Sequence, residues 1–133
     1  MALSTADRLA IHELLALHGH LMDEGAFHRL GELFTPDVRY DVTAFGAGEL
    51  RGPDAVAAAG RALADRNPVG HHVTNVLVGE DTDGTVRARS KGLGIYADGT
   101  AGSVVYDDVL RKVGDGWRIA ARKVTPRRVP LRP

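Results

Sequence analysis

The chain has 133 residues, a length typical of one domain, and its 17 Lys and Arg balance 17 Asp and Glu, which gives a formal net charge of zero. A neutral chain is atypical of nucleic-acid-binding proteins, which are usually basic. The absence of cysteine excludes disulfides, thiolate catalysis and cysteine metal sites. Without a signal-peptide pattern or an apolar run of the roughly 20 residues that span a bilayer, we expect a single cytoplasmic domain over 1–133, with no membrane partner.

Residues 5–23 repeat apolar side chains at helical spacing and predict a long amphipathic helix. His18 interrupts the apolar face near its middle, whereas His12 and His20 lie away from it and should face solvent. Asp23 closes the helix, where a carboxylate opposes the helix dipole at a cost of a few tenths to about 1 kcal/mol. Because structure alone would favour Lys or Asn at this position, we expect a functional role for Asp23.

The rest of the chain predicts an α+β protein. A short second helix, a turn, a first strand and a third helix are expected at 26–34, 35–37, 38–45 and 54–65. Four antiparallel strands follow at 70–80, 85–97, 102–113 and 116–125, joined by Asp-Gly turns. Three helices before such a glycine-rich sheet indicate a sheet that curls around a helix into a cone with one open mouth.

Alternation along 70–80 assigns its two histidines to opposite faces. His72 shares a face with Val76 and Val78, which we take as the inner face. His71 should therefore point to the surface or to an interface.

The same rule assigns the inner faces of the last two strands. Tyr106 and Asp108 share a face of 102–113, and Trp117 shares a face of 116–125 with Lys123. If Asp108 is inside, it is either a second acid–base group or a partner of Lys123. For Trp117, a core position is favoured over a stacking contact with a ligand.

Two stretches resemble a known family over nearly the whole chain. D-E-G-A-F-H-R-L-G-E-L-F-T-P-D-V after the first helix, and G-D-G-W-R-I-A-A-R-K-V-T-P-R-R at the end, resemble SnoaL-like proteins of the nuclear transport factor 2-like superfamily. The resemblance implies a cone-shaped α+β barrel, with about three N-terminal helices packed on a strongly curved, mainly antiparallel sheet. It also implies a homodimer, because relatives usually pair through the outer face of the sheet. Relatives include dehydratases, polyketide cyclases, isomerases, epoxide hydrolases and structural subunits, so the fold alone does not fix the reaction.

The resemblance to scytalone dehydratase suggests a site. That enzyme pairs an Asp at the end of the first helix with a His on a strand, and Asp23 and His72 match these two residues. Its second catalytic His corresponds to Tyr96 here, and its polar residue on the penultimate strand falls near Tyr106. The resemblance therefore implies acid–base chemistry and leaves open whether the reaction is the same dehydration.

We predict a cofactor-free dehydratase, cyclase or isomerase that acts on a small apolar oxygenated metabolite such as a polyketide. Asp23 would orient and polarise His72, which would act as general acid or base. Other residues expected to contact the substrate are His18, Tyr40, Tyr96, Tyr106, Asp108 and Trp117.

Alternatives remain for the residues and for the function. His18 is either a core histidine or a second pocket imidazole, and each tyrosine either packs or donates to a substrate oxygen. Epoxide hydrolysis by Asp23 and Asp108 around a water is a second hypothesis, and a non-catalytic ligand-binding or structural subunit is a third. No H-E-x-x-H motif and no glycine-rich nucleotide loop occurs, so no metal and no cofactor is expected. The sequence does not name the substrate.

Overall fold

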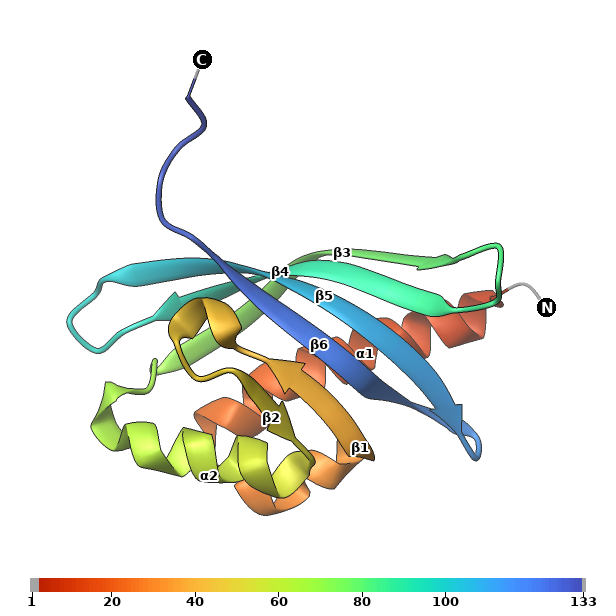
Figure 1. Ribbon diagram of the computed structural model, residues 1–133, viewed down its shortest axis with the longest axis horizontal. Coiled ribbons are helices and arrows are strands. Elements are labelled where there is room, and N and C mark those ends of the chain that lie inside the picture. The colour runs from red at the N-terminus through yellow and green to blue at the C-terminus, as the bar shows by residue number, and fades with distance from the viewer. Residues whose placement is uncertain (1–2, 133) are drawn as a thin grey trace.

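The structure, a computed structural model, describes residues 3–132 and shows one curved sheet with helices on its concave side (Figure 1). The helices are α1 (Thr5–Asp23), α2 (Pro53–Leu63) and the 3₁₀ helices η1 (Phe27–Glu32), η2 (Thr43–Phe45) and η3 (Ala64–Arg66). The strands are β1 (Phe34–Asp41), β2 (Glu49–Arg51), β3 (Gly70–Glu80), β4 (Val86–Ile95), β5 (Ala101–Val113) and β6 (Gly116–Arg127). Within 3–132, no helix is long and apolar enough to cross a membrane.

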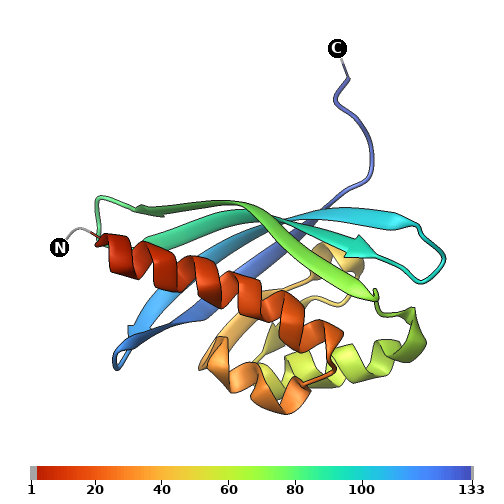
Figure 2. The ribbon, with the colours of Figure 1, turned by 180° about the vertical axis from the view of Figure 1, so that it is seen from behind.

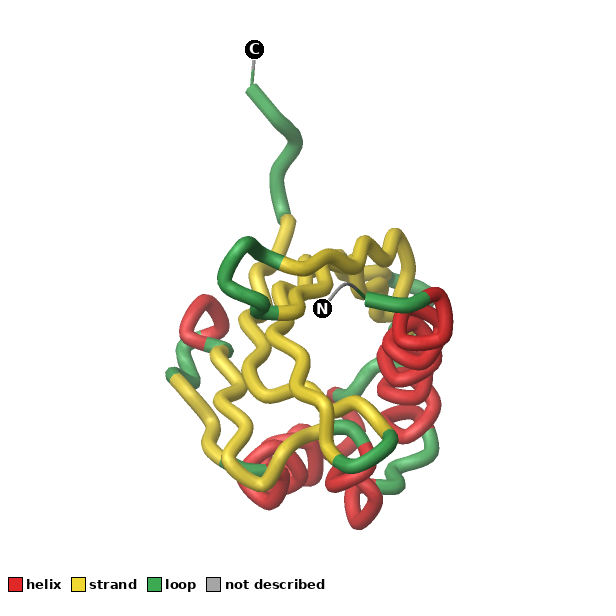
Figure 3. The backbone as a smooth tube through the Cα atoms, turned by 90° about the vertical axis from the view of Figure 1, so that its right-hand side faces the viewer, coloured by secondary structure: helices red, strands yellow, loops and turns green. Residues whose placement is uncertain are grey.

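The sheet has the order β2-β1-β6-β5-β4-β3, with β1 and β6 parallel and the other neighbours antiparallel. Figure 2 shows α1 lying across the concave side next to β3, and Figure 3 shows the sheet curving from α1 round to the end covered by η1 and α2. The sheet does not close on itself. This arrangement confirms the predicted α+β cone.

The long first helix has the predicted bounds, and its first turn is tied to the far end of the sheet. Ser4 and Asp7 form a capping box, in which the Asp7 N–H donates to Ser4 Oγ over 3.0 Å. Trp117 Nε1 donates to Asp7 Oδ1 over 3.1 Å, and the bonds from Ser4 and then from Trp117 lower the pKa of Asp7 to about 2. Asp7 and Asp23 are 16 residues apart, about 24 Å along the axis. Trp117 is therefore a core residue at the opposite end of α1 from Asp23.

The segment between the first and third helices differs from the prediction. The second helix is the shorter 3₁₀ helix η1, residues 35–37 lie inside β1 instead of forming a turn, and residues 43–45 are helical. The pairing of β1 with β6 is interrupted between Phe34 and Arg39. Pro36, which has no N–H to donate, lies in this interruption, so the strand tolerates it. The short strand β2 lies between the predicted first strand and the predicted third helix, where no element is expected.

A β-bulge in β3 reverses which side chains face inward. The pairing of β3 with β4 shifts register around Asn75, whose φ of 55° is left-handed. One extra residue exchanges the two faces of a strand. His71 therefore points inward before the bulge and Val76 points inward after it, whereas His72 is exposed. The prediction that His72 faces inward with Val76 is wrong, because the alternation does not continue through the bulge.

A second bulge acts in the same way on β6. The pairing with β5 shifts between Val109 and Leu110, and Ala120 is the extra residue. Beyond it Arg122 is buried and Lys123 is exposed. The predicted inner position of Lys123 is wrong for the same reason.

Candidate active site

A carboxylate–imidazole pair joins the end of α1 to the start of β3. The backbone N–H of His71 donates to Asp23 Oδ1 over 2.9 Å, and Oδ1 lies 2.7 Å from His71 Nδ1. Because an ionised carboxylate only accepts hydrogen bonds, this geometry places a proton on Nδ1 and leaves Nε2 as the basic nitrogen. The two side chains are 16% and 29% exposed, so the pair is partly open to solvent.

Close contact between the helix and the strand brings the pair together. A Cβ on Gly19 would collide with the backbone carbonyl oxygen of His71, so only glycine allows α1 to lie this near β3. Asp23 lies one turn further along the same face of the helix. The backbone and ring nitrogens of His71 compensate the Asp23 carboxylate, which is otherwise unfavourable at a helix C-terminus.

The predicted partner of Asp23 is therefore corrected from His72 to its neighbour. His72 is exposed on the outer face, and the prediction that His71 is a surface or interface residue is wrong. The His71 ring approaches the edge of His18, with 6.1 Å between ring centroids. Two imidazoles, from β3 and α1, thus lie side by side at the inner end of the pair.

His18 lies inside the cone and is 2% exposed. Its ring meets Tyr106 edge-on at 5.7 Å, and its Nδ1 has no hydrogen-bond partner among residues 3–132. Burial, together with the charges of Arg122 and His71, lowers the pKa of His18 well below its usual value. His18 is therefore neutral at pH 7.

A buried ion pair lies deeper in the interior. Arg122 Nε and Nη2 donate to the two oxygens of Asp108 over 2.7 and 2.9 Å, and both side chains are fully buried. Burial alone would lower the pKa of Arg122, but the charge and hydrogen bonds of Asp108 outweigh it and the pKa is raised. The predicted inward orientation of Asp108 is correct, and its partner is Arg122 instead of Lys123. Arg122 was missed because alternation without the bulge places it outside.

The three tyrosines lie in different surroundings. Tyr106 is buried with its ring 4.1 Å from the Arg122 guanidinium carbon, and Tyr40 lies on the inner side of β1. Burial raises the pKa of both phenols, so they stay protonated at neutral pH. Tyr96 is 38% exposed at the hairpin end of β4, outside this cluster. Ser90, which sequence reasoning also missed, is buried opposite Tyr106 in the β4–β5 ladder.

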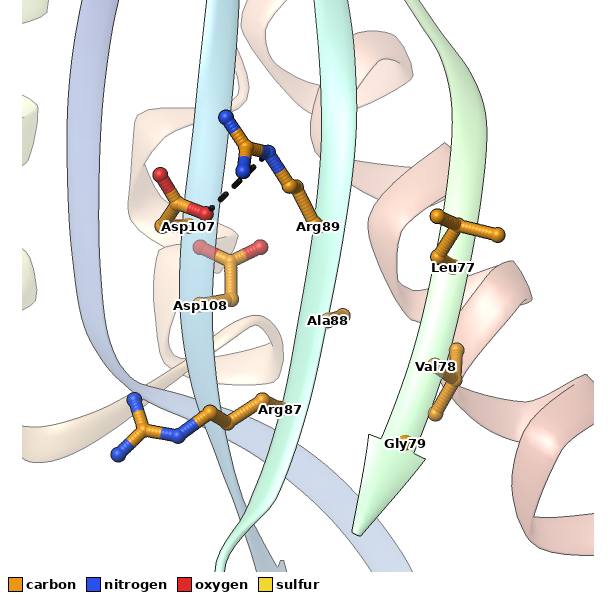
Figure 4. Close-up of a pocket in the computed structure, with 8 residues that line it drawn as sticks. All are labelled: Leu77, Val78, Gly79, Arg87, Ala88, Arg89, Asp107 and Asp108. Atoms are coloured by element: carbon orange, nitrogen blue, oxygen red, sulfur yellow. Dashed lines mark ion pairs between the residues drawn. The ribbon is translucent and has the colours of Figure 1, made fainter. Parts of the chain in front are cut away.

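A hollow of about 300 Å³ lies where β3, β4 and β5 adjoin, and Asp108 is among its lining residues (Figure 4). Its outer-face lining includes Leu77, Arg87 and Arg89, and Arg89 forms a loose 3.6 Å ion pair with Asp107. Neither Asp23 nor His71 lines it. Within the described part of the chain, no three His, Asp or Glu side chains gather in an arrangement that could hold a metal ion.

Comparisons place these features in a family. The chain is 32% identical to an NTF2-like protein with a cystatin-like fold from Novosphingobium aromaticivorans, with a TM-score of 0.73 over 90% of this chain and 80% of that one. The protein Aln2 from a Streptomyces species is 24% identical, with a TM-score of 0.77 over 95% and 94%. A scytalone dehydratase-like protein from N. aromaticivorans is 19% identical, with a TM-score of 0.74 over 96% and 90%. A search of functionally curated proteins finds no match.

The sequence model of the SnoaL-like domain matches residues 4–123, which is most of the chain. Together with the cone-shaped fold, this match confirms the resemblance found in the sequence. The protein belongs to the SnoaL-like family of the nuclear transport factor 2-like fold.

Proposed function

We propose that the protein is a cofactor-free acid–base enzyme of the dehydratase, cyclase or isomerase type. The observation that carries this proposal is the Asp23–His71 pair, with 2.7 Å between Oδ1 and Nδ1 at the partly open end of the interior. Membership of a family that includes such enzymes supports the same reaction class.

All three reaction types begin with the same step, the removal of a proton from a carbon next to a carbonyl group. Asp23 holds the proton of His71 on Nδ1, so that Nε2 is free to accept the substrate proton. The imidazolium formed is stabilised by the carboxylate beside it. Return of the proton to another carbon completes an isomerisation, and its delivery to a leaving hydroxyl completes a dehydration. A cyclisation results when the enolate carbon attacks a second carbonyl.

The interior favours a small, mostly apolar substrate. The buried core is formed mainly by aliphatic and aromatic side chains, and a few polar groups, including His18 and Tyr106, are embedded in it. Binding sites for small molecules commonly combine apolar walls with a few placed polar groups. An oxygenated cyclic or aromatic metabolite, such as a polyketide, fits this combination.

Epoxide hydrolysis is less well supported. It would require Asp23 and Asp108 to act on one water, and Asp108 does face the interior. However, both oxygens of Asp108 are engaged by Arg122, and Asp23 is bound to His71 at the rim. The two carboxylates therefore have separate partners.

A non-catalytic role predicts a pocket filled by side chains, or an Asp23 and a His72 too far apart to bond. The predicted bond to His72 is not formed, but His71 supplies the same group on the inner side. The chemistry that the pair can perform is thus retained with the neighbouring residue.

The shared first step can be tested without knowing the natural substrate. The probe is 2-tetralone in D₂O, an aromatic ketone whose acidic C–H exchange is followed by proton NMR. We expect Asp23→Asn and His71→Ala to lower the catalysed exchange rate by about 10²–10⁴-fold, the usual contribution of a positioned general base. His72→Ala is the matched control and should stay within about twofold of the wild type. Exchange no faster than in buffer, or equal loss in the control, would refute the proposal.

A further inference from the structure

Four buried side-chain polar atoms have no hydrogen-bond partner among residues 3–132. One is Oγ1 of Thr35, and the other three are Nη1 of Arg122, Oγ of Ser90 and Nδ1 of His18, on residues that are 1%, 1% and 2% exposed. Leaving a buried polar group unsatisfied costs about 1–3 kcal/mol each. Three such groups in one region indicate that the interior is built to bind a polar atom of a ligand.

All three residues surround the ring of Tyr106. The guanidinium carbon of Arg122 lies 4.1 Å from the ring centroid, and the His18 ring lies 5.7 Å from it. Ser90 is the direct cross-strand neighbour of Tyr106 in the β4–β5 ladder. The three residues therefore border the Tyr106 side chain from β6, α1 and β4.

Tyr106 lies among these three residues because Gly92 leaves room for it. A Cβ at Gly92 would collide with the ring and hydroxyl of Tyr106. The aromatic ring covers the Arg122 guanidinium and meets the His18 ring edge-on.

We propose that a carbonyl oxygen of the substrate binds in this interior, taking hydrogen bonds from Arg122 Nη1 and Ser90 Oγ, with the Tyr106 ring turned aside. The inference rests on the proposed function, and it assigns the substrate to enolisable carbonyl compounds. Arg122 and Ser90 are then the groups that stabilise the enolate. The sequence suggested tyrosines as donors to a substrate oxygen. Tyr96 is exposed, and the Tyr106 ring covers the Arg122 guanidinium.

Enolate formation at this site moves one proton and two electron pairs of the substrate. His71 Nε2 takes a proton from the carbon beside the carbonyl, the C–H pair forms the new C=C bond, and the carbonyl π pair moves to oxygen. Hydrogen bonds from donors that already point at that oxygen strengthen as negative charge develops on it. One such donor typically contributes about 10²–10³-fold in kcat.

The charge of the site favours this class over carboxylate ligands. Arg122 is already neutralised by Asp108 through two hydrogen bonds. A carboxylate carries its full charge before it binds and would have to lose its hydration on entering the interior, which is costly. A carbonyl group is neutral when it binds and becomes charged only during the reaction.

The test uses 4-nitrophenol, whose phenolate absorbs visible light and resembles an enolate. Its apparent pKa when bound reports whether donors stabilise the anion. We expect this pKa to be lower in the wild type than in Ser90→Ala by roughly one unit, a tenfold preference. Ser103→Ala on the exposed face of β5 is the matched control and should match the wild type. The double variant Arg122→Met/Asp108→Leu, which removes the ion pair without leaving a lone buried charge, should lose the preference further.

Several outcomes separate this inference from its alternatives. If Ser90→Ala merely stabilises the fold and leaves the pKa of the bound probe unchanged, Ser90 is an unsatisfied core hydroxyl and the inference is overturned. Failure of the wild type to bind 4-nitrophenol, or its displacement by benzoate at equal concentration, overturns it as well. Asp23→Asn should keep the phenolate preference while losing 2-tetralone exchange, so a failure of the acid–base proposal is distinguishable from a failure of this one.

Discussion

The neighbouring residues His71 and His72 provide the most direct test of the site, because they differ mainly in which face of β3 they occupy. His71→Ala removes the 2.7 Å bond between Nδ1 and Asp23 Oδ1 and the ring contact with His18. His72→Ala removes an exposed side chain. Both changes replace His by Ala in the same strand, so differences in strand propensity largely cancel.

The expected magnitude follows from the bond and its exposure. A hydrogen bond to a charged group contributes about 1.5–3 kcal/mol, and the 16% and 29% exposure of the two side chains reduces the expected contribution to about 1–2 kcal/mol. For 133 residues, an unfolding entropy of about 2.1 cal/mol/K per residue converts this loss to a fall in Tm of about 4–7 °C. His72→Ala should change the free energy of unfolding by less than about 0.5 kcal/mol, or about 2 °C.

Thermal unfolding followed by circular dichroism at pH 7 measures both variants. Asp23→Ala, which also removes the acceptor of the His71 backbone N–H, should be at least as destabilising as His71→Ala. Equal falls in Tm for His71→Ala and His72→Ala, or a larger fall for His72→Ala, would show that the bulge at Asn75 does not set the orientation described above.

Three further predictions follow from burial and packing. Because the pKa of His18 is lowered in the fold, its neutral form is favoured, so stability is complete above the unfolded pKa of about 6.5 and is lost as pH falls below it. Between pH 7 and 5.5 this loss should be about 1 kcal/mol in urea unfolding and absent in His18→Leu; equal slopes in both would contradict it. Gly19→Ala should separate α1 from β3 and reduce 2-tetralone exchange as much as Asp23→Asn, and normal exchange would show that the close contact is not needed. We also propose that a second copy of the chain covers the outer face of the sheet, with Leu77, which is 72% exposed, in the interface. Light scattering should then show a dimer for the wild type and a monomer for Leu77→Glu. A monomeric wild type at micromolar concentration would refute the dimer.

Local patterns determined most of the elements. The apolar periodicity of α1 and its final Asp23 were readable because a helix repeats with a fixed period and its ends carry known charge preferences. The bounds of β3 were also predicted correctly. The hairpin turns at Gly84 and Gly99 could be predicted because both glycines adopt the left-handed conformation that tight turns need. The last hairpin turns at Gly114 and Asp115, one residue earlier than the Asp115-Gly116 turn expected, because Val113 pairs with Gly116.

The identity of the inner residues was decided only by the pairing between strands. An alternating pattern assumes an uninterrupted strand, and a bulge appears only where one strand has an extra residue against its neighbour. Asn75 was a weak signal, since Asn tolerates a left-handed φ better than most residues. Ala120 gave none, because two adjacent alanines fit either face.

The expected role of Asp23 and the identity of its partner thus have different origins. The sequence alone marked Asp23, because a carboxylate at a helix C-terminus lacks a local reason. Its partner depended on two tertiary features, the contact at Gly19 and the bulge that turns His71 inward, and a third feature, the bulge in β6, turns Arg122 toward Asp108. Each of these depends on the spacing between elements distant in the chain, which no periodicity within one element records.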